Sequence, residues 1–362
     1  MMTETFRVMI IGTPYKMHLY QPLKRHFPSD LQVDLVSASL GHRNVPLLSR
    51  RSGTCFLPTK RMIDELIRFR PDVVFTDSGA YAGWYAKFYS CLRKRHIPLV
   101  AWLLGDFWTE YHALFSKAPL RVKAAGPFYF FTWSTGLNFA DRILAVCKWL
   151  ESIVKSRFPM KNTGVLYQGI DTECWLAQEN TLFALEHPAV GIVQDNNIFP
   201  KVKGLLWFSD VVKQMEDVHF YIAGGGPYTP LVQRTYSGLR NAHLVGRLPY
   251  PDGVRRFYLS TDVYVLPSGL DCCPTTLLEA SLCAKPTIAS KIGGIPELII
   301  EGETGWTVLN GRSDQWVSKI RSVLEDPGLA RRTGENARCF VAENFCWRTQ
   351  AAKLSSVIRD LQ

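Results

Sequence analysis

The chain has 362 residues, of which 47% are hydrophobic and 20% are charged. This composition excludes a disordered or fibrous protein, and the length fits two domains of roughly 150–180 residues. The net charge of +10 is unevenly placed, because residues 1–180 hold 23 Lys and Arg against 14 Asp and Glu, whereas residues 181–362 hold 19 against 18. We therefore expect the first half to meet an anionic partner such as a membrane surface, with a solvated basic face as the alternative. No nucleic-acid motif is present, so nucleic acid is not expected as a partner.

The cysteines and apolar runs indicate the compartment. The nine cysteines show no C-x-x-C spacing, so neither a zinc site nor a disulfide framework is expected. The apolar run at residues 6–11 is too short for the core of a signal peptide. No stretch reaches the roughly 18–20 uninterrupted apolar residues of a membrane span. These patterns predict a cytoplasmic protein that can bind peripherally to the cytoplasmic face of a membrane.

Short β-rich runs alternate with helical segments along the whole chain. In the first half, strands are predicted at 7–11, 33–36, 72–75, 99–104 and 142–146, and helices near 18–26, 60–69, 80–95, 119–139 and 148–157. The segment 172–188 contains no strong strand pattern. The alternation then restarts, with strands at 190–194, 219–223, 242–245, 263–266 and 286–289 and helices at 203–215, 229–236, 251–260, 275–284, 294–300 and 313–324. Two helices at 328–343 and 347–361 close the chain.

This alternation predicts an α/β protein with two doubly wound, Rossmann-like domains whose parallel sheets are covered on both faces. The first domain is expected over residues 1–172, a linker over 173–188 and the second domain over 189–345. The final helix, 346–362, is expected to cross back to the first domain. Ligands bind beyond the carboxyl ends of such strands, so two facing domains predict a cleft for a nucleotide or a sugar phosphate.

The segment 264–306 contains the most informative candidate site. A predicted strand ends at Leu266, a loop holds Asp271, and a helix begins at Thr275 or Thr276 and includes Glu279. A helix start offers unpaired N–H groups and the positive end of a dipole to a diphosphate, and the two carboxylates could accept hydrogen bonds from ligand hydroxyls. A capping box between Thr276 and Glu279, and an ordinary loop position for Asp271, are the alternatives without a ligand.

This segment resembles the glycosyltransferases of family 4, a retaining, nucleotide-sugar-dependent group with the GT-B fold. Asp271, separated from Glu279 by seven residues, matches the family pattern except that Asp replaces the usual Glu. Gly293 and Gly294 of a Gly-Gly-x-x-Glu motif follow in order. Further matches lie at 140–146, 167–171, 203–204, 222–227 and 245–248, and Ala284 stands where Gly-x-Pro is usual. Two domains facing across a cleft are the arrangement that the GT-B resemblance implies.

The resemblance implies a donor site in the second domain. Its donor-binding residues would be Lys203, Gly224, Gly226, Leu248, Asp271, Thr275, Thr276 and Glu279, with Gly12 of the first domain facing the diphosphate. Lys203 would offset the charge that builds on the leaving diphosphate. The family usually has an Arg upstream of this Lys, and residues 191–202 contain none. Either Lys201 or backbone amides could replace that Arg.

Candidate acceptor residues lie in the first domain, after the predicted strand 99–104. Asp106 is the first candidate for contact with the acceptor or a sugar hydroxyl, and His112 is the second. The resemblance implies a catalytic set of Asp106, Asp271 and Lys203. The alternative for Asp106 is that it only caps the helix that follows.

The resemblance implies a hexosyltransferase that moves a sugar from a UDP- or GDP-linked donor, with retention, to a lipid-linked or polysaccharide-precursor acceptor. No Asp-x-Asp is present, so no cofactor and no metal are expected. A nucleotide-sugar epimerase of the same shape and a catalytically silent partner subunit are the alternatives. For a membrane contact, the sequence offers Arg50, Arg51, Lys60, Arg61, Arg93, Lys94, Arg95, Lys117, Arg121 and Lys123, followed by the aromatic run 127–133. The identity of the sugar and the oligomeric state stay open.

Overall fold

The computed structural model describes residues 6–13, 17–37, 60–77, 80–116, 120–176 and 182–361. By their contacts, the residues divide into two compact units. Unit 1 comprises Met1–Gly169 together with Trp347–Gln362, and unit 2 comprises Ile170–Cys346. The last helix of the chain, α14 (Trp347–Arg359), therefore belongs to the first unit.

Unit 1 is a parallel six-stranded sheet with the strand order β2-β1-β3-β4-β5-β6. Its strands are β1 (Phe6–Gly12), β2 (Leu31–Ser37), β3 (Val73–Thr76), β4 (Leu99–Leu103), β5 (Arg142–Ala145) and β6 (Asn162–Val165). Its helices before α14 are α1 (Met17–Arg25), α2 (Lys60–Phe69), α3 (Ala80–Arg93), α4 (Phe107–Ser116), α5 (Leu120–Asn138) and α6 (Lys148–Arg157). The core of the unit includes Trp102, whose ring contacts those of Tyr20 and Phe75.

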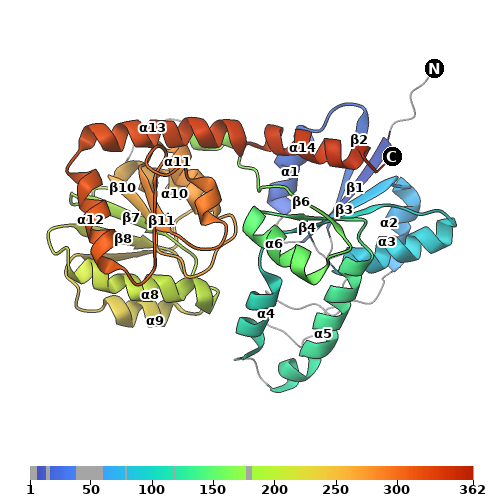
Figure 1. The fold of residues 1–362 in the computed structure, drawn as a ribbon, viewed down its shortest axis with the longest axis horizontal. Coiled ribbons are helices and arrows are strands. Elements are labelled where there is room, and N and C mark those ends of the chain that lie inside the picture. Colours follow the sequence, from blue (N-terminus) through green and yellow to red (C-terminus); the bar gives the residue numbers. More distant parts are fainter. Residues whose placement is uncertain are drawn as a thin grey trace. The chain divides into compact units, whose positions relative to one another are not determined.

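Unit 2 repeats this design with the strand order β12-β11-β10-β7-β8-β9, again parallel. Its strands are β7 (Ala189–Val193), β8 (His219–Ala223), β9 (Ala242–Gly246), β10 (Val263–Leu266), β11 (Thr287–Ser290) and β12 (Trp306–Val308). Its helices are α7 (Thr172–Leu176), α8 (Phe199–Lys213), α9 (Thr229–Tyr236), α10 (Asp252–Ser260), α11 (Thr275–Leu282), the 3-10 helix η3 (Ile295–Leu298), α12 (Ser313–Leu324) and α13 (Pro327–Asn344). Helices α8 and α9 lie on one face of the sheet, and α10 and α11 lie on the other (Figure 1).

The predicted fold class, two doubly wound parallel sheets, is confirmed. Four elements were missed: the edge strands β6 and β12 and the short helices α4 and α7. The two strands are only four and three residues long, too short for a clear hydrophobic pattern. The residues 294–300, predicted as a helix, form only η3.

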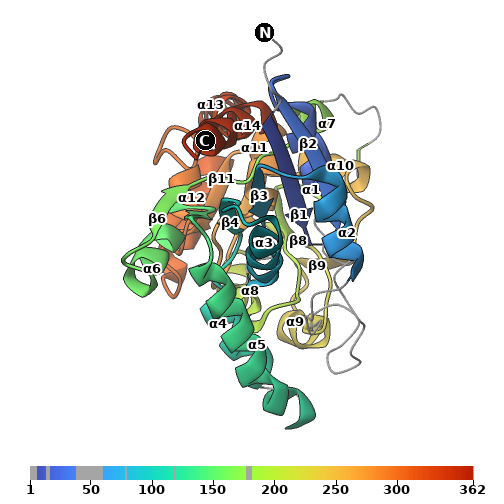
Figure 2. The same ribbon diagram turned by 90° about the vertical axis from the view of Figure 1, so that its right-hand side faces the viewer.

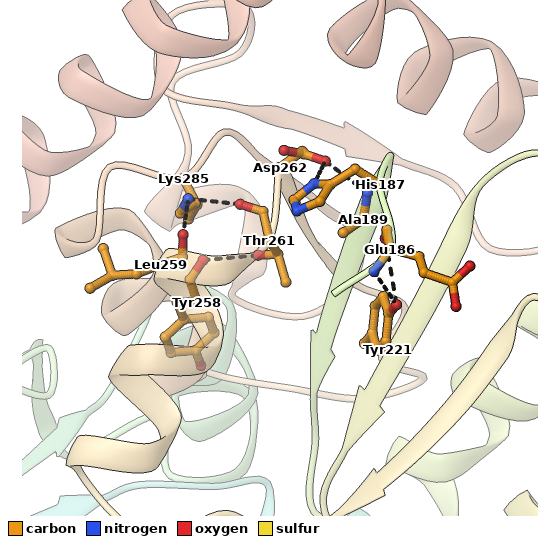
Figure 3. A network of polar contacts seen from close by, with 9 residues as sticks. All are labelled: Glu186, His187, Ala189, Tyr221, Tyr258, Leu259, Thr261, Asp262 and Lys285. Carbon is orange, nitrogen blue, oxygen red and sulfur yellow. Dashed lines mark hydrogen bonds and ion pairs between the residues drawn. The ribbon is translucent and has the colours of Figure 1, made fainter. Parts of the chain in front are cut away.

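A half-buried lysine links two segments at the amino ends of the strands of the second sheet, as Figure 3 shows. Lys285 Nζ donates to the carbonyl oxygens of Leu259 (3.1 Å) and Thr261 (2.7 Å), at the end of α10. Next to it, the Asp262 carboxylate accepts from the backbone N–H of Ala189 at 2.7 Å. Burial lowers the pKa of the Lys285 ammonium, while the carbonyls at the helix end stabilise its charge. Residue 285 therefore has a structural role within its motif.

The residue before this lysine is in an unusual backbone conformation. Ala284 has φ 53°, the left-handed region that favours glycine, and it stands at the position where the related motif usually has Gly. Its carbonyl oxygen lies against α13, where a Cβ built on Gly334 would lie 2.0 Å away from it. The contact between α11 and α13 therefore requires a glycine at position 334.

We predict that Gly334→Ala destabilises the protein by about 1–3 kcal/mol, because the added methyl group must push two backbone segments apart. Gly328→Ala is the matched control in the first turn of the same helix, where only side-chain atoms lie near the added Cβ. Its free energy of unfolding should stay level or rise by up to about 1 kcal/mol. Chemical denaturation of both variants measures the effects, and equal stability of the two would contradict the close backbone contact.

Candidate functional site

The order of strands in unit 2 marks one place as a ligand site. The order of the strands reverses between β7 and β10. The chain adds β8 and β9 on one side of β7, and it later adds β11 and β12 on the other side of β10. The crossover connections leave these two strands in opposite directions, which opens a crevice at their carboxyl ends. The loops that follow β7 and β10 therefore form the candidate site.

An ion pair joins these two loops. Lys201, in the first turn of α8, places Nζ 3.0 Å from Oδ1 of Asp271 in the loop after β10. The backbone N–H of Cys272 donates to the same oxygen at 3.1 Å. The Lys201 carbonyl accepts from the backbone N–H of Gly269 at 3.1 Å. Lys201 therefore holds the loop through both its side chain and its backbone carbonyl.

Lys203 is placed differently. Its side chain is exposed, and within the described ranges no hydrogen bond or ion pair engages its ammonium. The neighbouring Gly204 has a packing role, because a Cβ there would lie 2.1 Å from the carbonyl oxygen of Pro267. Lys203 therefore supplies an exposed cation, and Gly204 allows α8 to lie close to the loop after β10. The proposed contact of Lys203 with a diphosphate stays a prediction.

The start of α11 lies directly after this loop. The helix begins at Thr275, as predicted, with Pro274 at its N-cap and no side-chain cap. The capping box between Thr276 and Glu279 is therefore not formed. The part of the chain that the structure describes contains no acceptor for the backbone N–H groups of Thr275 and Thr276. These donors, at the positive end of the helix dipole, are suited to an anion.

Glu279 is buried inside unit 2, one turn after the start of α11. Only 3% of the residue is exposed, and its carboxylate accepts hydrogen bonds from the hydroxyls of Tyr258 (3.1 Å) and Tyr250 (3.4 Å). Burial raises the pKa of this carboxyl to about 7, although the hydrogen bonds lower it. The pKa of the Tyr250 hydroxyl is also raised, because this end of the side chain is removed from water beside Glu279 although the residue as a whole is exposed, so the hydroxyl stays protonated and can donate. The two tyrosines are site residues that the sequence analysis missed.

The glycine-rich turn after β8 packs on the chain itself. A Cβ on Gly224 would lie 1.9 Å from the carbonyl oxygen of Gln194, and one on Gly226 would lie 2.5 Å from that of Asn196. The turn therefore lies against the loop after β7, and these contacts alone require glycine. Leu248 is half-buried just beyond β9. The contacts of these three residues with a nucleotide stay predictions.

Gly293 meets Asp271 in a similar way. It has φ 57°, and a Cβ there would lie 2.0 Å from the carbonyl oxygen of Asp271. The same carbonyl accepts from the backbone N–H of Gly294 at 3.0 Å. The Gly-Gly motif therefore holds the backbone of Asp271 in place.

In unit 1, Asp106 caps the helix that follows it. One carboxylate oxygen accepts from the backbone N–H of Thr109 at 3.2 Å and the other accepts from the Thr109 hydroxyl, and only 4% of the residue is exposed. This capping is the alternative that the sequence analysis left open, and acceptor contact by Asp106 stays a prediction. His112 lies within α4, and its side chain is outside the described residues.

The sequence analysis missed a second carboxylate in unit 1. In this unit the order of the strands reverses between β1 and β3. Asp77 lies directly after β3, and its carboxylate accepts hydrogen bonds from the backbone N–H (2.9 Å) and the hydroxyl (2.7 Å) of Thr13. These bonds fix the loop that begins at Gly12, whose missing Cβ leaves room for the ring of Tyr20. An acid directly after a strand was the signal that could have identified Asp77.

The burial of Glu279 predicts how stability depends on pH. The ionised form is disfavoured in the folded state, so the free energy of unfolding should fall as pH rises from about 4.5 to about 7. Glu279→Gln stays neutral, and its stability relative to the wild type should rise over this window. The gain should reach up to about 3 kcal/mol, at about 1.4 kcal/mol per pKa unit. Urea denaturation at several pH values measures it, with the exposed Glu216→Gln as control. A constant difference between Glu279→Gln and the wild type would contradict the burial effect.

Two family models match the chain. The model described as Glycosyltransferase Family 4 matches residues 14–174, and the model described as Glycosyl transferases group 1 matches residues 191–326. Among curated proteins, a GDP-mannose-dependent alpha-(1-6)-phosphatidylinositol monomannoside mannosyltransferase of Mycolicibacterium smegmatis is 33% identical over 40% of this chain. A sulfoquinovosyl transferase of Arabidopsis thaliana is 24% identical over 81% of it. The matched parts span 41% and 58% of these two relatives' own lengths.

Solved structures match the whole fold. Sucrose-phosphate synthase of Thermosynechococcus elongatus has a TM-score of 0.70 at 17% identity, covering 98% of this chain and 99% of its own. Anabaena HepE, solved with UDP, has a TM-score of 0.70 at 15% identity, covering 98% and 100%. At such identities the likeness shows the fold alone, and the family models supply the assignment. The two models and the shared fold together show that the chain belongs to the glycosyltransferases of the GT-B fold and of the family 4 type.

Proposed function

We propose that the protein transfers a sugar from a UDP- or GDP-linked donor to an acceptor. The observation that supports this function best is the Lys201–Asp271 ion pair beside the start of α11, at the crevice of unit 2. A cation and free helix-start amides in one crevice suit a diphosphate. Relatives named for GDP-mannose and fold neighbours solved with UDP or UDP-glucose agree with a nucleotide-sugar donor.

In this proposal, Lys201, Lys203 and the backbone N–H groups of Thr275 and Thr276 hold the donor diphosphate. The bond between the anomeric carbon and the diphosphate oxygen breaks as the acceptor oxygen bonds to that carbon on the same face. The acceptor proton passes to the departing diphosphate, whose charge the two cations stabilise. The sugar therefore keeps its anomeric configuration.

Glu279 can take part as an acceptor of ligand hydroxyls. Because it is buried, a hydroxyl that reaches it must replace one of its present donors. The Tyr250 bond, at 3.4 Å the longer of the two, is the one to be displaced. Tyr250 is itself exposed, so it can move without opening the core.

We propose a lipid-linked or polysaccharide-precursor acceptor, bound by unit 1, and a peripheral position at the cytoplasmic face of a membrane. The excess of basic residues in the first half of the chain supports this assignment. The direct test incubates the protein with a panel of UDP- and GDP-sugars and measures nucleotide release with and without candidate acceptors. Release that depends on the acceptor supports transfer. Conversion of the donor into its epimer without net release of nucleotide would support an epimerase, and absence of nucleotide binding in calorimetry would support a silent subunit.

We predict that Lys201→Ala, Lys203→Ala and Glu279→Gln each weaken the binding of UDP or GDP by about 1–3 kcal/mol, the size of one charged hydrogen bond. Lys213→Ala, at the far end of the same helix and paired only with Asp210 on the surface, is the control and should bind as the wild type does. Isothermal titration measures the affinities. Unchanged affinity in all three variants would overturn the donor site.

We also predict transfer without a divalent metal ion, because lysines and helix-start amides take the place of a cation bound by Asp-x-Asp. Activity in EDTA should equal that in buffer alone. Loss of turnover in EDTA that Mn²⁺ restores would contradict this electrostatic scheme.

A further inference from the structure

Helix α3 of unit 1 presents a row of large apolar side chains to solvent. Trp84, Phe88 and Leu92 are 40%, 46% and 52% exposed. Their spacing of four residues places them on one side of the helix. An exposed apolar stripe of this kind on a surface helix marks a contact with a partner or a membrane.

The other side of α3 packs against the interior of unit 1. Tyr85, Ala86 and Tyr89 are buried, and a Cβ on Gly83 would lie 2.3 Å from the carbonyl oxygen of Gly136 in α5. Figure 2 shows α3 between α2 and α5. The helix is therefore fixed by its inner side, and the packing of unit 1 leaves the apolar stripe on the outside.

The stripe is surrounded by positive charge. Lys87, Arg93, Lys94 and Arg95 on or next to α3 are all exposed, and the helix contains no acidic residue. Among the described residues, only Arg95 of these four forms an ion pair, with its guanidinium nitrogen 3.6 Å from a carboxylate oxygen of Asp72. An apolar stripe flanked by unneutralised cations is complementary to a surface that is apolar inside and anionic outside.

A hollow lies beside the stripe. It has a volume of about 410 Å³ and is lined by Lys87 from α3 and by Phe139, Met160 and Lys161 from neighbouring segments. Phe139 contacts the ring of Trp84, with ring centroids 4.9 Å apart. Lys161 is held there by two carbonyl oxygens, those of Asn138 and Ala140. Asp141 also lines the hollow, with its carboxylate 2.9 Å from His96 Nε2, so the hollow adds apolar groups and charges of both signs to the surface beside α3.

This surface differs from the one that the sequence suggested. In the run 127–133, Trp133 is only 7% exposed and its ring stacks on that of Phe107, with centroids 3.7 Å apart, whereas Phe131 is 60% exposed. Within the described side chains of that run, Trp133 therefore belongs to the core, Phe130 is half-buried, and Phe131 faces solvent. Of the basic residues named with it, Arg50, Arg51 and Lys117 lie outside the described residues, as does the side chain of Arg121.

We infer that the outer side of α3 docks on an anionic lipid bilayer, with Trp84, Phe88 and Leu92 entering the headgroup region and the flanking cations on lipid phosphates. No helix in the described part of the chain is long and apolar enough to cross a bilayer. The inference depends on the proposed function in one respect: docking would bring unit 1 to a lipid-linked acceptor. Binding itself needs neither donor nor acceptor.

The test is co-sedimentation of the full chain with vesicles of phosphatidylcholine, alone or mixed with phosphatidylglycerol, at low and high salt and without any substrate. Wild type should bind the anionic vesicles at low salt and leave them at high salt. Phe88→Ser with Leu92→Ser, and separately Lys87→Glu with Arg93→Glu, should each lower the partition coefficient on the order of tenfold or more. Leu309→Ser with Arg240→Glu alters equally exposed positions of unit 2 and should bind as the wild type does.

Equal binding to both kinds of vesicle, or loss of binding only in the unit 2 control, would overturn the inference. So would a salt-independent dimer that the Phe88 and Leu92 substitutions dissolve in analytical ultracentrifugation, since the stripe would then be covered by a second copy. Circular dichroism confirms that each variant is folded. Vesicle binding without any transferase activity would leave the docking surface standing and remove only the proposed function.

Discussion

Close backbone contacts around the loop between β10 and α11 set the geometry of the candidate site in unit 2. Gly204 allows α8 to touch the carbonyl of Pro267, Gly269 lies where its own Cβ would be 2.1 Å from the carbonyl of Pro200, and Gly293 touches the carbonyl of Asp271. Any side chain at these positions would separate the segments. The Lys201–Asp271 ion pair can form because the two loops are held this close, and the start of α11 follows from the same loop.

The elements that could be predicted from the sequence are those with long hydrophobic runs. The central strands of both sheets and the long helices α3, α8 and α12 produce strong patterns, and their sheet order follows from the alternation of strand and helix. The edge strands β6 and β12 and the helix α7 are each five residues or fewer. Elements of this length depend on their neighbours in the fold rather than on their own pattern.

The site was predictable in position more than in detail. The order of the motifs pointed to the segment around Asp271. Residue type alone, however, does not tell which hydrogen-bond donor a carboxylate contacts in the folded protein. Asp106 is satisfied by the helix it precedes, and Glu279 by two tyrosines that lie 21 and 29 residues earlier. Spacing also favoured Lys203 over Lys201, although the first is solvated and the second is paired. Such pairings depend on how loops fold over one another, which a linear pattern does not contain.

The position of α14 has a consequence for the order in which the protein is built. Its Arg359 pairs with Asp30, with a nitrogen–oxygen distance of 2.8 Å, and a Cβ on Gly169 would meet the ring of Trp347. Unit 1 therefore encloses unit 2 in the sequence as an insertion. Domains fold as units while the ribosome proceeds from the N-terminus. Because α14 follows all of unit 2 in the sequence, its packing against α1 in unit 1 can form only after unit 2 has been synthesised.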